Sequence, residues 1–282
     1  MSRWSPARKQ AGATRLDPAR DMAVDAAAIC FALLLPTAVI ALVDTRSLDG
    51  AGIWAKPLKF QVSFGLHLLT VALLLPLVAG DVRRRAITRV PVTLLAVGAL
   101  LEVLYVTLQA ARGRHSHFNV ETGLESFLYY GVMGGAAVTI VVATAWIGGL
   151  IWRHPAPQRR PGLALGAALG LVLGSAVTLV VAAPLAAGAI DGPGHWVGGL
   201  RSDAHGLPLV GWSTTGGDLR VPHFFATHLM QALPLTGWIA DWLRPGRARA
   251  LVWAAAALGL LVTAGTLTQA VSGQPFLGVA SG

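Results

Sequence analysis

The chain contains little cysteine and few charged residues. Its 282 residues include one cysteine, Cys30, and only 12% are charged. A single cysteine excludes an intramolecular disulfide and any metal cluster held by several cysteines. The low charge is combined with 54% hydrophobic residues and a mean hydropathy of +0.62, a composition typical of a membrane protein rather than a soluble domain.

Lysines and recognised cofactor motifs are also scarce. Nearly all of the 22 basic residues are arginines, and the only lysines are Lys9, Lys56 and Lys59. With so much alanine and glycine, this composition indicates a GC-rich coding bias, so the lysine pair in "KPLK" is informative. The spacings HExxH and CxxCH do not occur, which leaves no recognised metalloprotease or c-type haem motif.

Long apolar runs account for most of the remaining sequence. They cover approximately residues 22–43, 57–80, 90–111, 123–151, 162–188, 222–243 and 249–271. About 20 apolar residues cross the ~30 Å hydrocarbon core as a helix, and lipid offers no partners to unpaired backbone groups. We therefore predict an all-α polytopic membrane helix bundle with seven transmembrane helices over 22–271, between a basic tail (1–21) and a C-terminal tail (272–282).

Basic residues are distributed unequally between alternate connections. Most lie in the N-terminal tail and in the connections that contain Arg83, Arg153 and Arg244. By the positive-inside rule, the N-terminus is cytoplasmic and the C-terminus extracytoplasmic, in a cell inner (plasma) membrane. The basic residues then determine topology, so the expected partner is the lipid bilayer and nucleic acid is not expected.

The predicted outer side carries most of the polar residues. The connection "QAARGRHSHFNVETGLES" (109–126) contains arginines, histidines and glutamates, and the glycine-rich segment 189–221 is either an ordered lid or a tether. The "TGLE" sequence predicts a capping box in which Glu125 reaches back to Thr122. This asymmetry predicts a functional site at the outer face.

Polar side chains form stripes on three of the predicted helices. One stripe contains Lys59, Ser63 and His67, spaced by four residues, and a second contains Glu102, Gln109 and Arg112. The sixth helix contributes His223, His228 and Gln231, and the outer loop contributes His117 and Asn119. We expect these side chains to line one extracytoplasmic pocket. An ionisable group deep in the membrane needs a partner, and the partner expected for Glu102 is His67 or Lys59.

Imidazoles and carboxylates in such a pocket favour a transition metal (Zn, Cu or Fe) or haem b. The expected metal ligands are His67, His228, His223 and His117. The expected catalytic groups are Glu102, Lys59 and Ser63, and the expected cofactor-binding groups are Arg112, Gln109, Asn119 and Gln231. Redox or hydrolytic chemistry is the first interpretation. A carrier or receptor for a small anion or proton, or a membrane assembly protein, is the alternative, so whether the chain is an enzyme is left open.

Four sequence blocks resemble the signatures of a bacterial family of seven-helix integral membrane proteins to which no activity is attached. They are "WAKPLKFQVS" (54–63), "RGRHSHFN" (112–119), "GLPLVGWSTTGGDLRVPHF" (206–224) and "HLMQALPL" (228–235). The resemblance implies the seven-helix architecture and the position of the site. "SFGLH" (63–67) also has the Ser-x-x-x-His spacing of seven-helix zinc hydrolases such as alkaline ceramidases, but their later His-x-x-x-His is absent.

Overall fold

The computed structural model describes residues 17–204 and 206–278. Most of the expected basic tail, and the last residues of the expected C-terminal tail, lie outside these ranges.

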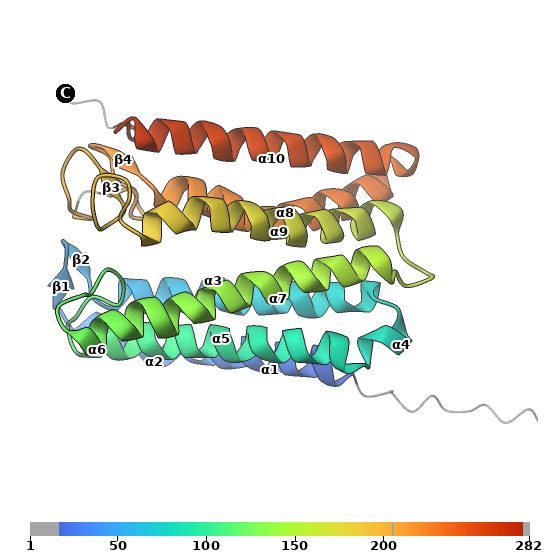
Figure 1. Ribbon diagram of the computed structural model, residues 1–282, viewed down its shortest axis with the longest axis horizontal. Helices are drawn as coiled ribbons and strands as arrows, with labels where there is room; N and C mark the ends of the chain where they lie inside the picture. The colour runs from blue at the N-terminus through green and yellow to red at the C-terminus, as the bar shows by residue number, and fades with distance from the viewer. Residues whose placement is uncertain (1–16, 205, 279–282) are drawn as a thin grey trace, which may run out of the picture.

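Long helices run side by side along the molecule and make the predicted all-α bundle (Figure 1). They are α1 (Pro18–Ala32) followed by α2 (Leu34–Val43), α3 (Ala55–Leu74) with the 3-10 turn η1 (Leu75–Leu77), α5 (Ala86–Ala111), the π-helix η2 (Phe127–Met133) followed by α7 (Gly134–Arg153), α8 (Pro161–Ala186), α9 (Arg220–Leu243) and α10 (Ala248–Val271). The short elements are the hairpins β1 (Ser47–Leu48) with β2 (Ala51–Gly52) and β3 (Trp196–Val197) with β4 (Gly217–Asp218), the helices α4 (Gly80–Arg83) and α6 (Gly123–Ser126), and the 3-10 turn η3 (Pro245–Arg247).

Within residues 17–204 and 206–278, six helical segments are long and apolar enough to cross a membrane. They are Pro18–Val43, Ala55–Leu77, Ala86–Ala111, Gly123–Arg153, Pro161–Ala186 and Pro245–Val271. The chain is therefore a multi-pass helical membrane protein. Helix α9 has sufficient length but is not among the six, since polar residues such as His223, His228 and Gln231 reduce its hydropathy. Its crossing of the membrane remains a prediction.

The first helix begins at Pro18, whereas hydropathy alone indicated residue 22. The Asp17 side chain accepts a hydrogen bond from the backbone N–H of Arg20 (3.5 Å), and proline suits the first helical position. The helix is interrupted at Leu33, because Pro36 has no N–H to donate to the carbonyl of Ala32. Local capping and proline chemistry therefore set these boundaries.

The helices form two groups, one of α1, α2, α3, α5 and α7 and one of α8, α9 and α10 (Figure 1). The main packing between the groups is that of α7 on α8. The largest apolar cluster contains the fully buried Leu68, Leu95, Ile147 and Leu171, which come from α3, α5, α7 and α8. The two groups are thus joined mainly through the packing of α7 against α8.

Helices α8 and α9 approach each other closely through glycines spaced by four residues. A Cβ atom at Gly166 would collide with the carbonyl oxygen of Leu233, and one at Gly170 would lie 2.8 Å from the carbonyl oxygen of Leu229. Gly162 and Gly174 continue the same row. Small residues at this spacing let membrane helices pack backbone to backbone.

The two ends of the bundle differ. One end, here called the cap, consists of residues 44–54, 112–122 and 187–219 and includes both β-hairpins. The opposite end, here called the arginine end, consists of residues 78–85, 154–160 and 244–249. Helix α1 starts at the arginine end and α10 finishes at the cap (Figure 1).

Candidate functional site at the cap

The segments of the cap are hydrogen-bonded to each other and to α3. The carbonyl oxygen of Asp49 accepts from the backbone N–H of Asp203 (2.7 Å) and from the Ser202 hydroxyl (3.1 Å). The Lys59 ammonium donates to the carbonyl oxygen of Val210 (2.9 Å), which connects α3 to the glycine-rich segment. Residues 189–204 and 206–221 therefore form a cover over this end of the bundle.

Arg220, at the start of α9, holds the cover to the helices. Its Nη2 lies 2.6 Å from Asp218 Oδ2 and 2.8 Å from Asp203 Oδ1, and donates to the carbonyl oxygen of Gly211 (2.6 Å). Asp218 is buried and also accepts from the backbone N–H of Ser213 (2.9 Å). The network joins several parts of the glycine-rich segment to the start of α9. It was not predicted, because nothing in the spacing indicates that Asp203 and Asp218 share one guanidinium.

His195 is the other partner of Asp203, with its Nε2 3.3 Å from Asp203 Oδ1. Burial raises the pKa of Asp203, but the hydrogen bond with His195 and the charge of Arg220 outweigh it and lower the pKa to about 2. Burial lowers the pKa of His195, and the bond with Asp203 offsets only part of this. At neutral pH the network therefore contains a carboxylate and a neutral imidazole.

Beneath the cap, Lys56 at the start of α3 is influenced by four charged groups from other segments of the chain. Those acting on its ammonium belong to Arg220, Asp203, Asp49 and Glu102, from α9, two segments of the cap and α5. Lys56 nevertheless keeps an exposed surface. Charged groups of both helix groups and of the cap therefore act on Lys56.

Glu102 of α5 is buried, with 4% of its surface exposed. Among the described residues its carboxyl group has neither a hydrogen-bond partner nor an ion pair. The charge that acts on it is that of Lys56. The expected pairing of Glu102 with His67 or Lys59 is therefore wrong, because His67 bonds to α7 and Lys59 bonds to the cap.

His117 and His223 complete what is here called the central cluster, with Lys56 and Glu102. Burial, followed by the charges of Lys56 and His223, holds the pKa of His117 well below its ordinary value, so this imidazole is neutral. Its ring packs against Phe60 of α3 (5.7 Å between centroids) and Tyr129 of η2 (5.8 Å).

The π-helix η2 presents Tyr129 to His117. Tyr129 is buried, and its hydroxyl donates to the carbonyl oxygen of Ala186 (3.3 Å), which joins the two helix groups. Single π-helical turns within α-helices frequently occur at functional sites. His223 Nδ1, on the other side of the cluster, is buried and lacks a hydrogen-bond partner among the described residues.

His67 has a defined tautomer. Its Nε2 lies 3.0 Å from the hydroxyl of Thr144, whose only hydrogen goes to the carbonyl oxygen of Ile140 (2.8 Å). His67 Nε2 must therefore donate, which leaves Nδ1 with a lone pair in the neutral ring. Ser63, one turn away on α3, is exposed.

His228 of α9 is defined in the same way. Its Nδ1 lies 2.7 Å from the carbonyl oxygen of Phe224, which can only accept, so Nδ1 donates and Nε2 keeps the lone pair. The ring stacks on Phe224 (3.9 Å between centroids) and is exposed. Gln231 is half-buried on the same helix.

Gln109 and Arg112 are used inside the protein. Gln109 Nε2 donates to Glu125 Oε2 (2.8 Å), and Arg112 Nη1 donates to Gln109 Oε1 (2.7 Å). The Thr122 hydroxyl accepts from the backbone N–H of Glu125 (3.2 Å), so the predicted N-cap is confirmed. The Glu125 carboxylate does not return to Thr122, since Gln109, Arg112 (3.1 Å) and Arg114 (3.7 Å) bind it instead.

Asn119 shapes the loop that contains His117. Its amide donates to the carbonyl oxygen of His115 (3.2 Å) and its Oδ1 accepts from the backbone N–H of Glu121 (3.3 Å). These local bonds stabilise the turn that places His117 over α3.

Across residues 17–204 and 206–278, no group of three or more His, Cys, Asp or Glu side chains is arranged to hold a metal ion. The four expected ligands are distributed over α3, α9 and the cap. Comparisons with known proteins add no assignment: no family model, no curated protein and no solved structure matches the chain.

Proposed function

We propose that this membrane protein binds a small anion together with a proton in the central cluster, as a carrier or receptor. The observation that carries the proposal is Lys56, an exposed residue beneath the cap whose ammonium group is acted on by the charges of Arg220, Asp203, Asp49 and Glu102. In that position Lys56 is the natural counter-charge for a small carboxylate or inorganic anion that enters between the helix groups.

Glu102 is the group that accepts the proton in this scheme. An unpaired carboxylate inside a membrane protein is costly, so Glu102 requires either a proton or the charge of Lys56. When an anion binds to Lys56, the positive charge of Lys56 no longer stabilises the Glu102 carboxylate. Glu102 then takes up a proton. Binding of one negative charge is thereby accompanied by one proton, and the cluster stays close to neutral.

The neutral rings of the cluster suit the same ligand. His117 is uncharged and packs among aromatic side chains, so it offers hydrogen bonds without adding charge. The cover formed by residues 189–221 limits the opening toward the aqueous phase. We propose that this face is extracytoplasmic, in keeping with the distribution of arginines.

The test is calorimetric titration of the purified protein with acetate, chloride and inorganic phosphate in buffers of different ionisation enthalpy. We expect one of these anions to bind with uptake of about one proton. Lys56→Gln should weaken binding at least about tenfold, equivalent to ~1.4 kcal/mol. Glu102→Gln should retain binding without proton uptake.

Arg84→Gln is the matched control, because it removes one positive charge at the arginine end. It should leave both affinity and proton uptake unchanged. Equal losses in Lys56→Gln and Arg84→Gln would contradict the assignment of the site, and binding without proton uptake in the wild type would contradict the coupling.

A second candidate function is binding of haem b or a transition metal, and one observation favours it. His67 and His228 each donate one ring N–H to a protein oxygen and keep a lone pair on the other nitrogen, as metal-bound histidines do. Two histidines on different helices suit bis-histidine haem better than a zinc site with three protein ligands. Metal analysis and absorption spectra of purified wild type and His67→Ala test this, and protein without metal or a Soret band contradicts it.

A further inference from the structure

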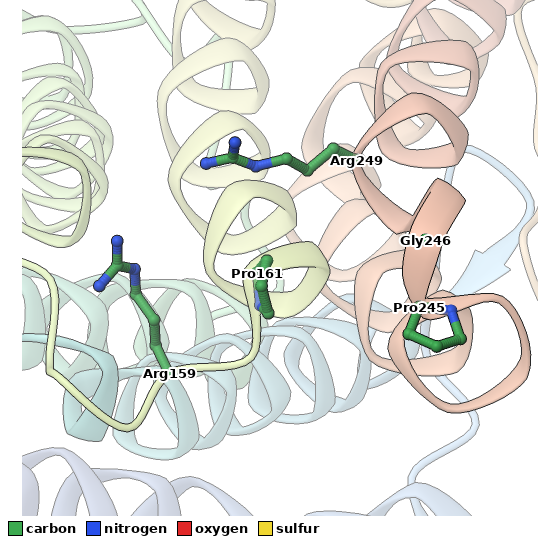
Figure 2. A pocket seen from close by; sticks show the side chains of 5 residues that line it. All are labelled: Arg159, Pro161, Pro245, Gly246 and Arg249. Carbon is green, nitrogen blue, oxygen red and sulfur yellow. The ribbon is translucent and has the colours of Figure 1, made fainter.

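The arginine end contains a cavity of about 510 Å³ between the starts of α8 and α10. Arg159, Pro161, Pro245, Gly246 and Arg249 line it. Figure 2 shows the guanidinium groups of Arg159 and Arg249 extending to the same side of the start of α8. A second hollow next to it shares Pro245 and Gly246 and adds Arg244 and Arg247.

No carboxylate in the described chain neutralises these arginines. Arg159 Nη1 donates only to the carbonyl oxygen of Ala156 (3.4 Å), and Arg249 has no ion pair among residues 17–204 and 206–278. The nearby Asp241 is already occupied, since it accepts from the backbone N–H groups of Gly162 (2.8 Å) and Leu163 (2.7 Å). The cavity therefore has a net positive charge and unused guanidinium donors.

Exposed tryptophans place this end at the level of the lipid headgroups. Trp152, Trp242 and Trp253 lie near the ends of α7, α9 and α10 at the arginine end, with 59%, 77% and 52% of their surfaces exposed. Tryptophan concentrates where the hydrocarbon meets the headgroup region. Leu251, also exposed, offers an apolar surface beside the cavity.

We propose that this cavity binds the phosphate of an anionic phospholipid, with Arg159 and Arg249 as its ligands. Guanidinium groups bind phosphate oxygens in pairs, and basic pockets between transmembrane helices suit anionic headgroups. The fatty-acid chains would lie along the exposed surface of α10. Arginines at the helix ends serve as topology signals along the chain. At this cavity, Arg159 and Arg249 would in addition bind lipid.

The experiment is titration of delipidated protein, by native mass spectrometry, with phosphatidylglycerol, phosphatidylcholine and inorganic phosphate. We expect phosphatidylglycerol to bind more tightly than phosphatidylcholine, and the double variant Arg159→Gln/Arg249→Gln to lose about tenfold in affinity for it. The control Arg84→Gln/Arg89→Gln removes the same charge from the arginine end and the adjoining first turn of α5, and should keep wild-type affinity. Where the glutamine pair does not insert, Arg159→Lys/Arg249→Lys retains the charge and should still lose affinity, because lysine cannot bind phosphate in the paired geometry.

Two results would overturn the proposal. Equal losses in the test and control pairs would mean that binding follows the overall charge of this end rather than the cavity. Displacement of phosphatidylglycerol by inorganic phosphate at similar concentrations would identify a free-phosphate site instead of a lipid site.

Discussion

At the scale of residues, the cap depends on Asp203 and its two partners, His195 and Arg220. The pKa of Asp203 is lowered to about 2, below about 3.9 for an unfolded aspartate. A carboxyl group with a lowered pKa contributes stability that is fully present above the unfolded value. That contribution to stability is lost as the pH falls toward the pKa of Asp203 in the folded protein, so stability should change between about pH 4 and pH 2.

Asp203→Asn should therefore reduce the free energy of unfolding by about 2 kcal/mol at neutral pH, because a charged hydrogen-bond acceptor is lost. The difference from wild type should shrink as the pH is lowered from about 4 to 2. Denaturant unfolding in detergent, followed across this range, measures it. Asp81→Asn is the control, since the exposed pair of Asp81 with Arg85 should contribute less than about 1 kcal/mol. If wild type and Asp203→Asn differ in free energy of unfolding by the same amount at pH 7 and pH 2, the charge of Asp203 does not stabilise the cap.

Residue by residue, the sequence indicated polar residue types at the outer end but not which side chains pair. Glu102, His117 and His223 were expected in the pocket and lie in the central cluster, and the function of that cluster stays a prediction. Lys56 was not among the expected site residues, although "KPLK" was the most unusual lysine usage in the chain. Helical spacing identifies residues that share one face of a helix. Which charged residue lies opposite Glu102 depends on how α3 packs against α5. A single sequence does not specify this packing.

At the scale of elements, the row of glycines on α8 decides how closely α9 packs. Gly166→Ala should destabilise the protein by about 1–3 kcal/mol, because the new Cβ collides with the carbonyl oxygen of Leu233. Thermal unfolding measures this. Gly135→Ala is the matched control in α7, where no atom lies within 4 Å of the added Cβ. It should be neutral or slightly stabilising, and equal destabilisation by both changes would refute close packing as the cause.

The existence of the long helices could be predicted, because apolar runs of about 20 residues have no other structure in lipid. Their ends could not be predicted to the residue, since Asp17 extends the first helix and the 3-10 turn η1 finishes the second. The π-helix η2 also has no signature in hydropathy. The row from Gly162 to Gly174 was not predicted either, because glycines at this spacing do not indicate which helix packs against them.

At the scale of the whole molecule, the long helices alternate in direction between the cap and the arginine end (Figure 1). Six of the seven expected spans are long and apolar enough to cross a membrane among the described residues, and the crossing by α9 stays a prediction. Which end faces the cytoplasm is a prediction that rests on the distribution of arginines. A reporter fused after Arg249 should be cytoplasmic and one inserted at Gly199 should be extracytoplasmic. Enzymatic reporters active on only one side of the membrane measure this, and reversed labelling would place the cap in the cytoplasm.

The fold of the cap is the part of the molecule that the sequence predicted least. Its segments are joined through backbone atoms, as at Asp49 and Val210, and backbone bonds leave no residue-type signature. The glycine-rich composition of 189–221 fits an ordered cover and a tether equally well. The bonds of Arg220 and Lys59 to this segment distinguish a cover from a tether, and they are known only from the structure.

The central claim is that water and small anions reach Lys56 between the two helix groups, and the single cysteine permits a direct measurement. Ser63 is exposed on α3, two turns beyond Lys56, so Ser63→Cys in a Cys30→Ser background places one thiol in the proposed path. Rates of modification by small anionic and cationic thiosulfonates would be measured in membranes, with the buried Leu68→Cys as the unreactive control. We predict faster reaction with the anionic reagent and loss of that preference when Lys56→Gln is added; an unreactive thiol, or a preference for the cationic reagent, would contradict the account.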